Sequence, residues 1–216
     1  RSTLDRSAAA SDVYKRQPCD LSSIDGIKDF MKIISEKEDG IDFLVNNAGA
    51  AWGESFETFS EQGWDKVMDL NVKSIFFLTQ QMRDLLSKRS SLEDPSRVIN
   101  IGSIDGLNVP ALETYSYSAS KSAVHHLTRV MASKLVKENI LVNAIAPGPY
   151  PSNMLGPAVN YDYSEIEKRN PRKRVGSPED IAGLVIFLCS RAGAYTVGET
   201  ITSDGGIVKT ASHNLG

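Results

Sequence analysis

The sequence predicts an α/β fold in which a parallel sheet carries helices on both faces. From Leu21 to the C-terminus, short apolar runs rich in β-branched residues alternate with helical patterns, as in proteins whose strands are buried on both faces. The stretches between the runs are long enough for the crossover helices that parallel strands require. A length of 216 residues, 41% of them apolar, suits one domain.

Four apolar runs, at residues 41–45, 97–101, 140–145 and 199–202, are expected to be the strands. Two long helices are expected between them, at about 64–86 and 116–137, because apolar residues recur there at three- and four-residue steps. These residues are Val67, Leu70, Leu78, Met82 and Leu85 in the first helix and Ala119, Ala123, Leu127, Val130, Met131 and Leu135 in the second. Residues 1–17 show neither period, so we expect an unrelated or disordered tail before a single domain at 18–216.

The composition argues against several classes of partner. The net charge is −3, so no overall positive field attracts nucleic acid or an anionic membrane. No apolar run approaches the roughly 20 residues that span a bilayer, and we expect a soluble, cytoplasmic protein. We expect no metal site. The two cysteines are too few for one, and the adjacent His125 and His126 point in different directions along a helix. Surface or interface positions are expected for both histidines.

Tyr117 and Lys121 are four residues apart on the second long helix, so they share one face. A lysine ammonium in that place would favour the tyrosinate and lower the pKa of the phenol from about 10. Such a tyrosine could exchange a proton with an alkoxide. An isolated pair with this spacing is more often a half-buried tyrosine beside a solvated lysine, so the context decides.

Polar and small residues follow the predicted strands at their carboxyl ends, where ligands bind in open α/β sheets. Ser103 follows the strand at 97–101 and could donate to a carbonyl oxygen, although a serine there is commonly a turn residue. The run 46–49 (NNAG) is a small-residue turn that lets a flat ligand approach the backbone, or an ordinary turn. Pro147 and Gly148 begin an irregular stretch that is either a substrate lid or a plain surface loop.

Six motifs together resemble the short-chain dehydrogenase/reductase family in order and spacing. They are CDL at 19–21, NNAG at 46–49, LNV at 70–72, IGS at 101–103, YSASK at 117–121 and NAIAPG at 143–148. The resemblance extends from Cys19 to Gly206 and implies a Rossmann-like, doubly wound sheet. It also implies a nicotinamide cofactor, NADP or NAD, and hydride transfer between that cofactor and a ketone or secondary alcohol.

The resemblance assigns roles to individual residues. Tyr117 would be the general acid or base, Lys121 would lower its pKa and hold the nicotinamide ribose, Ser103 would orient the carbonyl, and Asn71 would hold a water that links Lys121 to solvent. The cofactor would be contacted by Asp20 and Leu21 at the adenine, by Asn47, Ala48 and Gly49 at the adenosine, and by Pro147, Gly148, Tyr150 and Ser152 at the nicotinamide and phosphates. Tyr117 and Lys121 belong to both sets.

Within the family, the phrase APGPYPSNM at 146–154 resembles 3-oxoacyl-acyl-carrier-protein reductases of the rhamnolipid-biosynthesis type. This branch implies NADP, a small-molecule or acyl-thioester substrate, and a homodimer or homotetramer formed through the two long helices. The basic residues of 168–174 could then meet an acidic carrier protein. The acidic residues that flank them favour the alternative, a solvated loop. An epimerase or dehydratase of the same superfamily would use the same tyrosine and lysine.

The sequence departs from the family pattern at its N-terminus. The glycine-rich turn that holds the pyrophosphate at a helix N-terminus and the first strands have no counterpart here. We therefore expect an N-terminally truncated sheet, with an open apolar edge at the strand 41–45. The alternative to an enzyme is a non-catalytic remnant that only associates with partner subunits.

Overall fold

The computed structural model describes residues 18–210, so the tail expected at 1–17 lies outside the described residues. One parallel sheet has its strands in the order β1-β2-β3-β4. They are β1 (Phe43–Asn46), β2 (Ser96–Ile101), β3 (Ile140–Pro147) and β4 (Thr200–Ser203). All four predicted strands are confirmed, with ends that differ from the expected ones by at most two residues.

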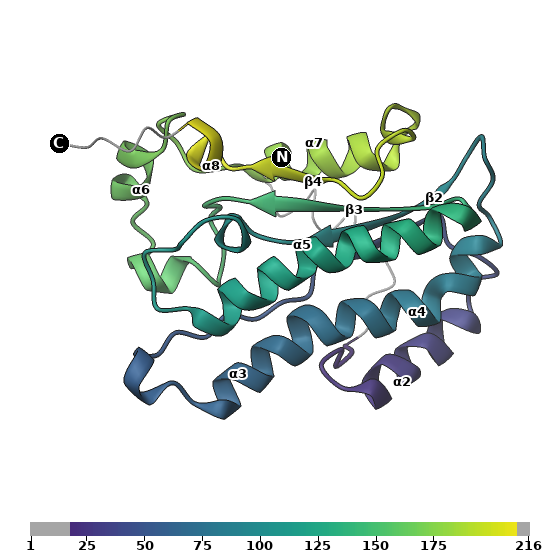
Figure 1. The fold of residues 1–216 in the computed structure, drawn as a ribbon, viewed down its shortest axis with the longest axis horizontal. Helices are drawn as coiled ribbons and strands as arrows, with labels where there is room; N and C mark the ends of the chain where they lie inside the picture. Colours follow the sequence, from purple (N-terminus) through teal and green to yellow (C-terminus); the bar gives the residue numbers. More distant parts are fainter. Residues whose placement is uncertain (1–17, 211–216) are drawn as a thin grey trace, which may run out of the picture.

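Helices cover both faces of the sheet (Figure 1). On one face lie α2 (Ile24–Ser35), α4 (Ser74–Ser87) and α5 (Tyr115–Leu135), and on the other lies α7 (Pro178–Cys189). The expected doubly wound, Rossmann-like arrangement is therefore confirmed. The shorter helical elements are η1 (Phe56–Thr58), η3 (Ile104–Gly106), η4 (Val136–Glu138), η5 (Gly156–Val159), α6 (Ser164–Arg169), η6 (Arg191–Gly193) and α8 (Ile207–Thr210).

Successive residues of β2 face two different cores, because side chains alternate along a strand. Val98 packs in the larger core under α2, α4 and α5, whereas Ile99 packs in the smaller core with Ile145 and Leu188 of α7. Burial on both faces explains why these strands read as continuous apolar runs. β1 is the exception, since Phe43 is 51% exposed and Val45 41% exposed on its outer face.

The first long helix is not continuous, and the expected single helix at 64–86 is wrong on this point. α3 (Glu61–Met68) passes into a π-helical turn, η2 (Asp69–Lys73), before α4 begins. The amide of Ser74 donates to the carbonyl of Asp69, five residues earlier, which marks the wide turn. The apolar period of the sequence runs through this turn, so the pattern gives no sign of it.

Side-chain hydrogen bonds fix where helices start. Ser23 and Ser60 accept from the amides three residues on, at 3.0 and 3.2 Å, at the starts of α2 and α3. Pro178 is the first residue of α7, and Asp180 accepts from the Ser177 amide at 2.8 Å. These caps explain helix boundaries that the apolar pattern leaves open.

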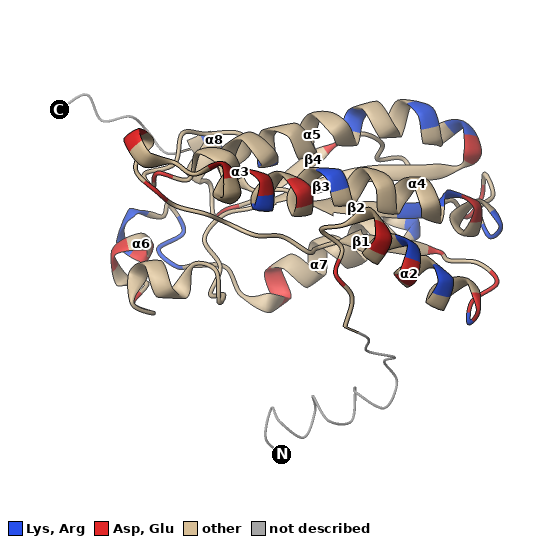
Figure 2. Cartoon of the chain, turned by 90° about the horizontal axis from the view of Figure 1, so that it is seen from below, with Lys and Arg blue, Asp and Glu red and all other residues tan. Residues whose placement is uncertain are grey.

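Charge and hydropathy show no membrane-spanning or single-sign feature in the described part. Across residues 18–210 no helix is both long and apolar enough to cross a membrane. In the view of Figure 2, basic and acidic residues lie side by side on α2, α3 and α4. The mixture agrees with the small net charge of −3.

Candidate active site

Ser103 lies two residues beyond the end of β2 and begins η3. Its hydroxyl oxygen accepts from the amide of Asp105 at 3.2 Å, and the side chain is 7% exposed. Because a backbone amide occupies one lone pair of this oxygen, the hydroxyl keeps its own proton for donation to another group. The structure thus places a donor at the carboxyl edge of the sheet.

Lys121 lies on the buried face of α5, one turn after Tyr117. Its Nζ is 5.4 Å from the centre of the Tyr117 ring and donates to the carbonyl of Ile101 at 2.8 Å. The side chain is 6% exposed, and burial lowers its pKa from 10.5 to about 8. At pH 7 the ammonium is therefore still mostly charged.

Tyr117 does not show the expected lowering of its pKa. Burial raises the pKa of the phenol, the Ser103 side chain lowers it, and the charge of Asp105 raises it again. Burial is the largest of these contributions and outweighs the lowering by Ser103. The phenol consequently keeps its proton at neutral pH, as a proton donor must.

Asn71 lies in the π-helical turn and is 1% exposed. Its Oδ1 accepts from the Ala50 amide at 2.8 Å, and its Nδ2 donates to the Ala50 carbonyl and to the Ser120 hydroxyl, both at 2.9 Å. Both amide hydrogens of Asn71 are thus used by protein groups. The residue joins the segment after β1 to α5, and it can meet a water only through the remaining lone pair of Oδ1.

Asn46, expected in the turn after the first strand, is instead the last residue of β1. Its amide donates to Asn100 at 2.8 Å and to Thr79 at 3.2 Å. This buried side chain is satisfied by its neighbours. It fixes the end of β1 against β2 and α4.

The rest of the NNAG turn is open to a ligand. Asn47 and Ala48 are exposed, and Gly49 is half-buried. A Cβ at Gly49 would lie 3.3 Å from Oδ1 of Asn71 and 3.8 Å from Nζ of Lys121. The glycine therefore leaves a cradle beside Lys121 that a side chain would fill.

At the end of β3 the backbone passes close to β4. A Cβ at Gly148 would lie 2.8 Å from Cα of Asp204, which explains the glycine after Pro147. Ser152 accepts from the amide of Leu155 at 3.1 Å and so closes a local turn. These three residues stand at the carboxyl edge of the sheet, where a cofactor is expected.

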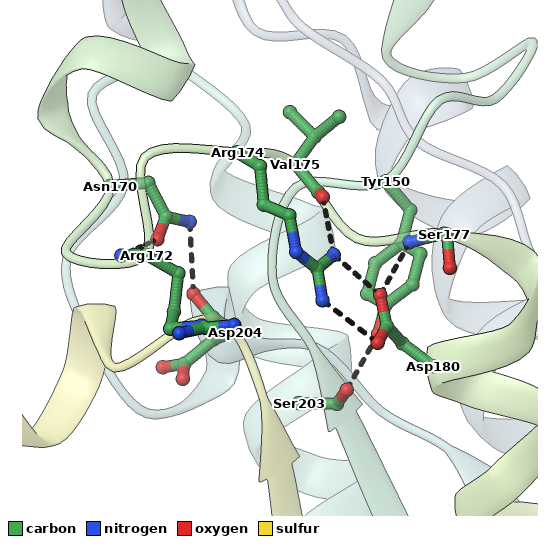
Figure 3. A network of polar contacts seen from close by, with 9 residues as sticks. All are labelled: Tyr150, Asn170, Arg172, Arg174, Val175, Ser177, Asp180, Ser203 and Asp204. Atoms are coloured by element: carbon green, nitrogen blue, oxygen red, sulfur yellow. Dashed lines mark hydrogen bonds and ion pairs between the residues drawn. The ribbon is translucent and has the colours of Figure 1, made fainter.

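Tyr150 turns toward a cavity on the α7 side of the sheet. Its hydroxyl bonds to Ser203 at 2.5 Å, and nearby Arg174 makes two bonds to Asp180, at 2.6 and 2.9 Å (Figure 3). The cavity, of about 620 Å³, lies between the ends of β3 and β4 and the start of α7. None of the four residues expected to be catalytic, Asn71, Ser103, Tyr117 and Lys121, lines it.

Asp20 and Leu21 precede α2. The carboxylate of Asp20 accepts from the amide and the hydroxyl of Ser22, at 2.9 and 2.6 Å, and these bonds lower its pKa. Leu21 packs against the larger core. One carboxylate oxygen of Asp20 is thus committed to a local turn, which leaves the other for a ligand.

Two residues near the site were missed or misplaced in the sequence analysis. His125, expected at the surface or an interface, is 5% exposed and contacts Ser103, whereas His126 is exposed as predicted. Asp105 is half-buried, and burial raises its pKa. The four-residue step from Lys121 to His125 was the available signal. No group of three or more potential metal ligands occurs within 18–210.

A parallel sheet with a serine past one strand and a Tyr-x-x-x-Lys helix packed beside it defines the short-chain dehydrogenases and reductases, and this chain belongs to that family. Residues 2–208 match the family described as enoyl-(acyl carrier protein) reductase. Members of the family are oxidoreductases that use NAD or NADP.

Particular relatives narrow the comparison. The chain is 44% identical over 192 residues to the rhamnolipids biosynthesis 3-oxoacyl-[acyl-carrier-protein] reductase of Pseudomonas aeruginosa, covering 88% of this chain and 75% of that protein. It is 39% identical over 210 residues to 2-dehydro-3-deoxy-D-gluconate 5-dehydrogenase of Escherichia coli, covering 94% and 80%. The RhlG/NADP active-site complex of Pseudomonas aeruginosa superposes with a TM-score of 0.85 at 42% identity, covering 89% and 76% of the two chains.

Proposed function

We propose that this chain is a nicotinamide-dependent carbonyl reductase that interconverts a ketone and a secondary alcohol. One observation carries the proposal: Ser103, Tyr117 and Lys121 converge between the end of β2 and the start of α5, with Lys121 buried and charged at pH 7. Membership of an oxidoreductase family supports the reaction type.

The cradle at Gly49 fits the cofactor, as does the buried ammonium beside it. We propose that Lys121 and Tyr117 hold the nicotinamide ribose. Asn47, Ala48 and Gly49 are proposed for the adenosine, and Pro147, Gly148, Tyr150 and Ser152 for the nicotinamide and phosphates. Asp20 and Leu21 are proposed for the adenine. When bound, the nicotinamide supplies the hydride in reduction and receives it in oxidation.

The chain's own residues would handle the substrate oxygen and its proton. Ser103 donates its hydroxyl hydrogen to the carbonyl oxygen, which orients the ketone and stabilises the charge that develops there. Tyr117 gives its phenolic proton to that oxygen as the alcohol forms. Lys121 favours the tyrosinate left behind, and Asn71 holds the turn at Ala50 beside Lys121 in place.

For the cofactor we propose NADP in preference to NAD. The similarity to the RhlG/NADP complex, at 42% identity, supports NADP. A 7α-hydroxysteroid dehydrogenase solved with NADH is also similar, at 31% identity and a TM-score of 0.80. We choose NADP over NAD because the identity to the NADP complex is the higher of the two.

For the substrate we propose a 3-oxoacyl thioester, supported by the 44% identity to a 3-oxoacyl-[acyl-carrier-protein] reductase. Exposed apolar side chains follow η3 and β3 and would suit an acyl chain; they are Leu107, Val109, Leu112 and Met154. A keto sugar acid is the second candidate, supported by the 39% identity to 2-dehydro-3-deoxy-D-gluconate 5-dehydrogenase. We also propose a homodimer or homotetramer through α4 and α5, on which Phe76 and Val130 are exposed.

The test is reduction of acetoacetyl-CoA with NADPH, compared with NADH and with a keto sugar acid. Replacing Tyr117 by Phe removes the phenolic hydroxyl and with it the proton donor, so turnover should fall by about 100-fold or more while the protein stays folded. Tyr195→Phe is the matched control, because Tyr195 is fully exposed and its turnover should not change. Substantial turnover in Tyr117→Phe, or none in the parent chain with any of these substrates, would count against the proposal.

A further inference from the structure

His125 continues the stripe of α5 that carries the proposed catalytic pair. Tyr117, Lys121 and His125 follow each other at four-residue steps, which places them one above another on a helix. His125 is 5% exposed, and a buried polar side chain is expected to have a hydrogen-bond partner. Its partner is the backbone of Ser103, after β2.

The backbone amide of Ser103 donates to Nε2 of His125 at 3.4 Å. The preceding amide, that of Gly102, donates to the carbonyl of Ile145 in β3 at 2.7 Å, so the sheet holds it. Beyond Gly102 the strand ladder has ended. Ser103 is therefore held by the imidazole instead of by a neighbouring strand.

The ring must be neutral to accept this hydrogen bond. Burial, followed by the charges of Lys121 and Arg129, lowers the pKa of His125 from 6.5 to about 4. With Nε2 accepting, the proton of the neutral ring lies on Nδ1. The backbone of Gly106 has a smaller effect and raises the pKa of His125. Within the described part of the chain, Nδ1 of His125 is buried and has no hydrogen-bond partner.

Gly102 shows how closely the strand end passes the ring. A Cβ there would lie 2.2 Å from Nε2 of His125, closer than any real contact, and 3.2 Å from the carbonyl of Ile145. The glycine thus allows the imidazole to reach the Ser103 amide. Gly102 and His125 fit together as a pair.

We propose that His125 is a positioning residue, whose neutral imidazole holds the backbone of Ser103 so that the serine hydroxyl faces the substrate carbonyl. His125 itself touches neither substrate nor cofactor. The inference rests on the proposed function, because it assigns Ser103 the role of carbonyl donor. It adds a residue behind the catalytic serine that acts only through it.

The kinetic test compares three variants with the parent protein. In His125→Leu the Ser103 amide loses its acceptor, so kcat should fall about 10- to 100-fold, as expected for a misplaced catalytic group, while KM for NADPH stays the same. His125→Gln puts an oxygen near the place of Nε2 and should recover at least half of this loss on a logarithmic scale. His126→Leu is the matched control, because that neighbour is exposed and its kcat should not change.

A second measurement reports on the contact without any turnover. In ¹⁵N NMR of the parent protein at pH 7, His125 should be the neutral tautomer with its proton on Nδ1. A proton on Nε2, or equal kcat in His125→Leu and the parent, overturns the inference even if the proposed reaction holds. A parent that reduces no ketone overturns the proposed function, while the tautomer still decides whether Ser103 is held as described.

Discussion

At the level of single residues, the pKa values of Tyr117 and Lys121 are shifted in opposite directions by the same cause. Burial penalises the charged form of each, which raises the pKa of the phenol and lowers that of the ammonium to about 8. Near pH 7 the pair is therefore a protonated acid beside a charged lysine. This is the state that reduction of a ketone requires.

The pH dependence of activity should follow Lys121. As pH rises through about 8, the ammonium loses its proton, whereas Tyr117 stays protonated because its pKa is raised above 10. We expect kcat/KM for NADPH, which reports groups of the free enzyme, to fall above about pH 8 toward a tenfold loss per pH unit. Initial rates between pH 6 and 10 measure this. A profile that is flat to pH 9.5 would show that the charge of Lys121 does not matter.

At the level of elements, the π-helical turn places Asn71 where a regular helix would not. Its side chain makes three hydrogen bonds, two to Ala50 after β1 and one to Ser120 of α5. Buried polar groups that lose such partners are costly, at about 1–3 kcal/mol each. The turn therefore connects helix geometry with the shape of the candidate cofactor cradle.

Replacing Asn71 by Ala should lower the free energy of unfolding by about 2–4 kcal/mol, because the Ala50 amide and carbonyl are left without partners, and should also reduce activity. Asn71→Asp keeps the acceptor for the Ala50 amide but cannot donate, so a carboxylate would face the Ala50 carbonyl. We expect it to be no more stable than Asn71→Ala. Urea unfolding measures both variants, and an unchanged midpoint in either one would contradict the role described for the amide.

The start of α7 offers a prediction about stability alone. Asp180 bonds to Arg174 and to the Ser177 amide, and these contacts hold its pKa far below the usual range. Asp180→Ala should lower Tm at pH 7. Because the pKa of Asp180 is depressed in the folded state, its contribution to stability is fully present above the unfolded pKa of about 3.9. This stability is lost as the pH falls from there through the folded-state pKa.

Arg174→Gln is the control for the start of α7, since it removes the ion pair but keeps the bond from the Ser177 amide to Asp180. Its loss of Tm should be the smaller of the two. Equal losses would mean that the ion pair, and not the helix cap, supplies the stability. Calorimetry of both variants at pH 7 separates the two contributions, and calorimetry at lower pH follows the loss of the Asp180 contribution.

At the level of the whole molecule, the sheet and its layers bring the proposed groups to one edge. A ligand that binds only the folded state raises stability by mass action, by about 2.7 kcal/mol at 100 times its dissociation constant. For a chain of this size, NADPH at that concentration should raise Tm by roughly 5 to 10 °C. NADH at equal concentration should raise it less, and no shift with either would argue against a working cofactor site.

The sequence was sufficient for the layers of the fold but not for several contacts of the site. Strands buried on both faces leave continuous apolar runs, so all four could be predicted, and the spacing of Tyr117 and Lys121 places them on one helical face. The four-residue step from Lys121 places His125 on the same helical face, but its contact with Ser103 could not be predicted, because Ser103 comes from another element. The bonds of Asn71 likewise depend on a turn that the apolar period hides.

The π-helical turn also has a consequence for the balance between stability and activity. Its wide hydrogen bonds arise from one residue more than a straight helix would hold. A chain shortened by one residue within Asp69–Lys73 would let α3 run directly into α4 as a regular helix, yet it would draw the amide of Asn71 away from Ala50. The helix would become more regular, but the Ala50 amide and carbonyl would lose their partners, so the gain in helix regularity would be offset both in stability and at the site.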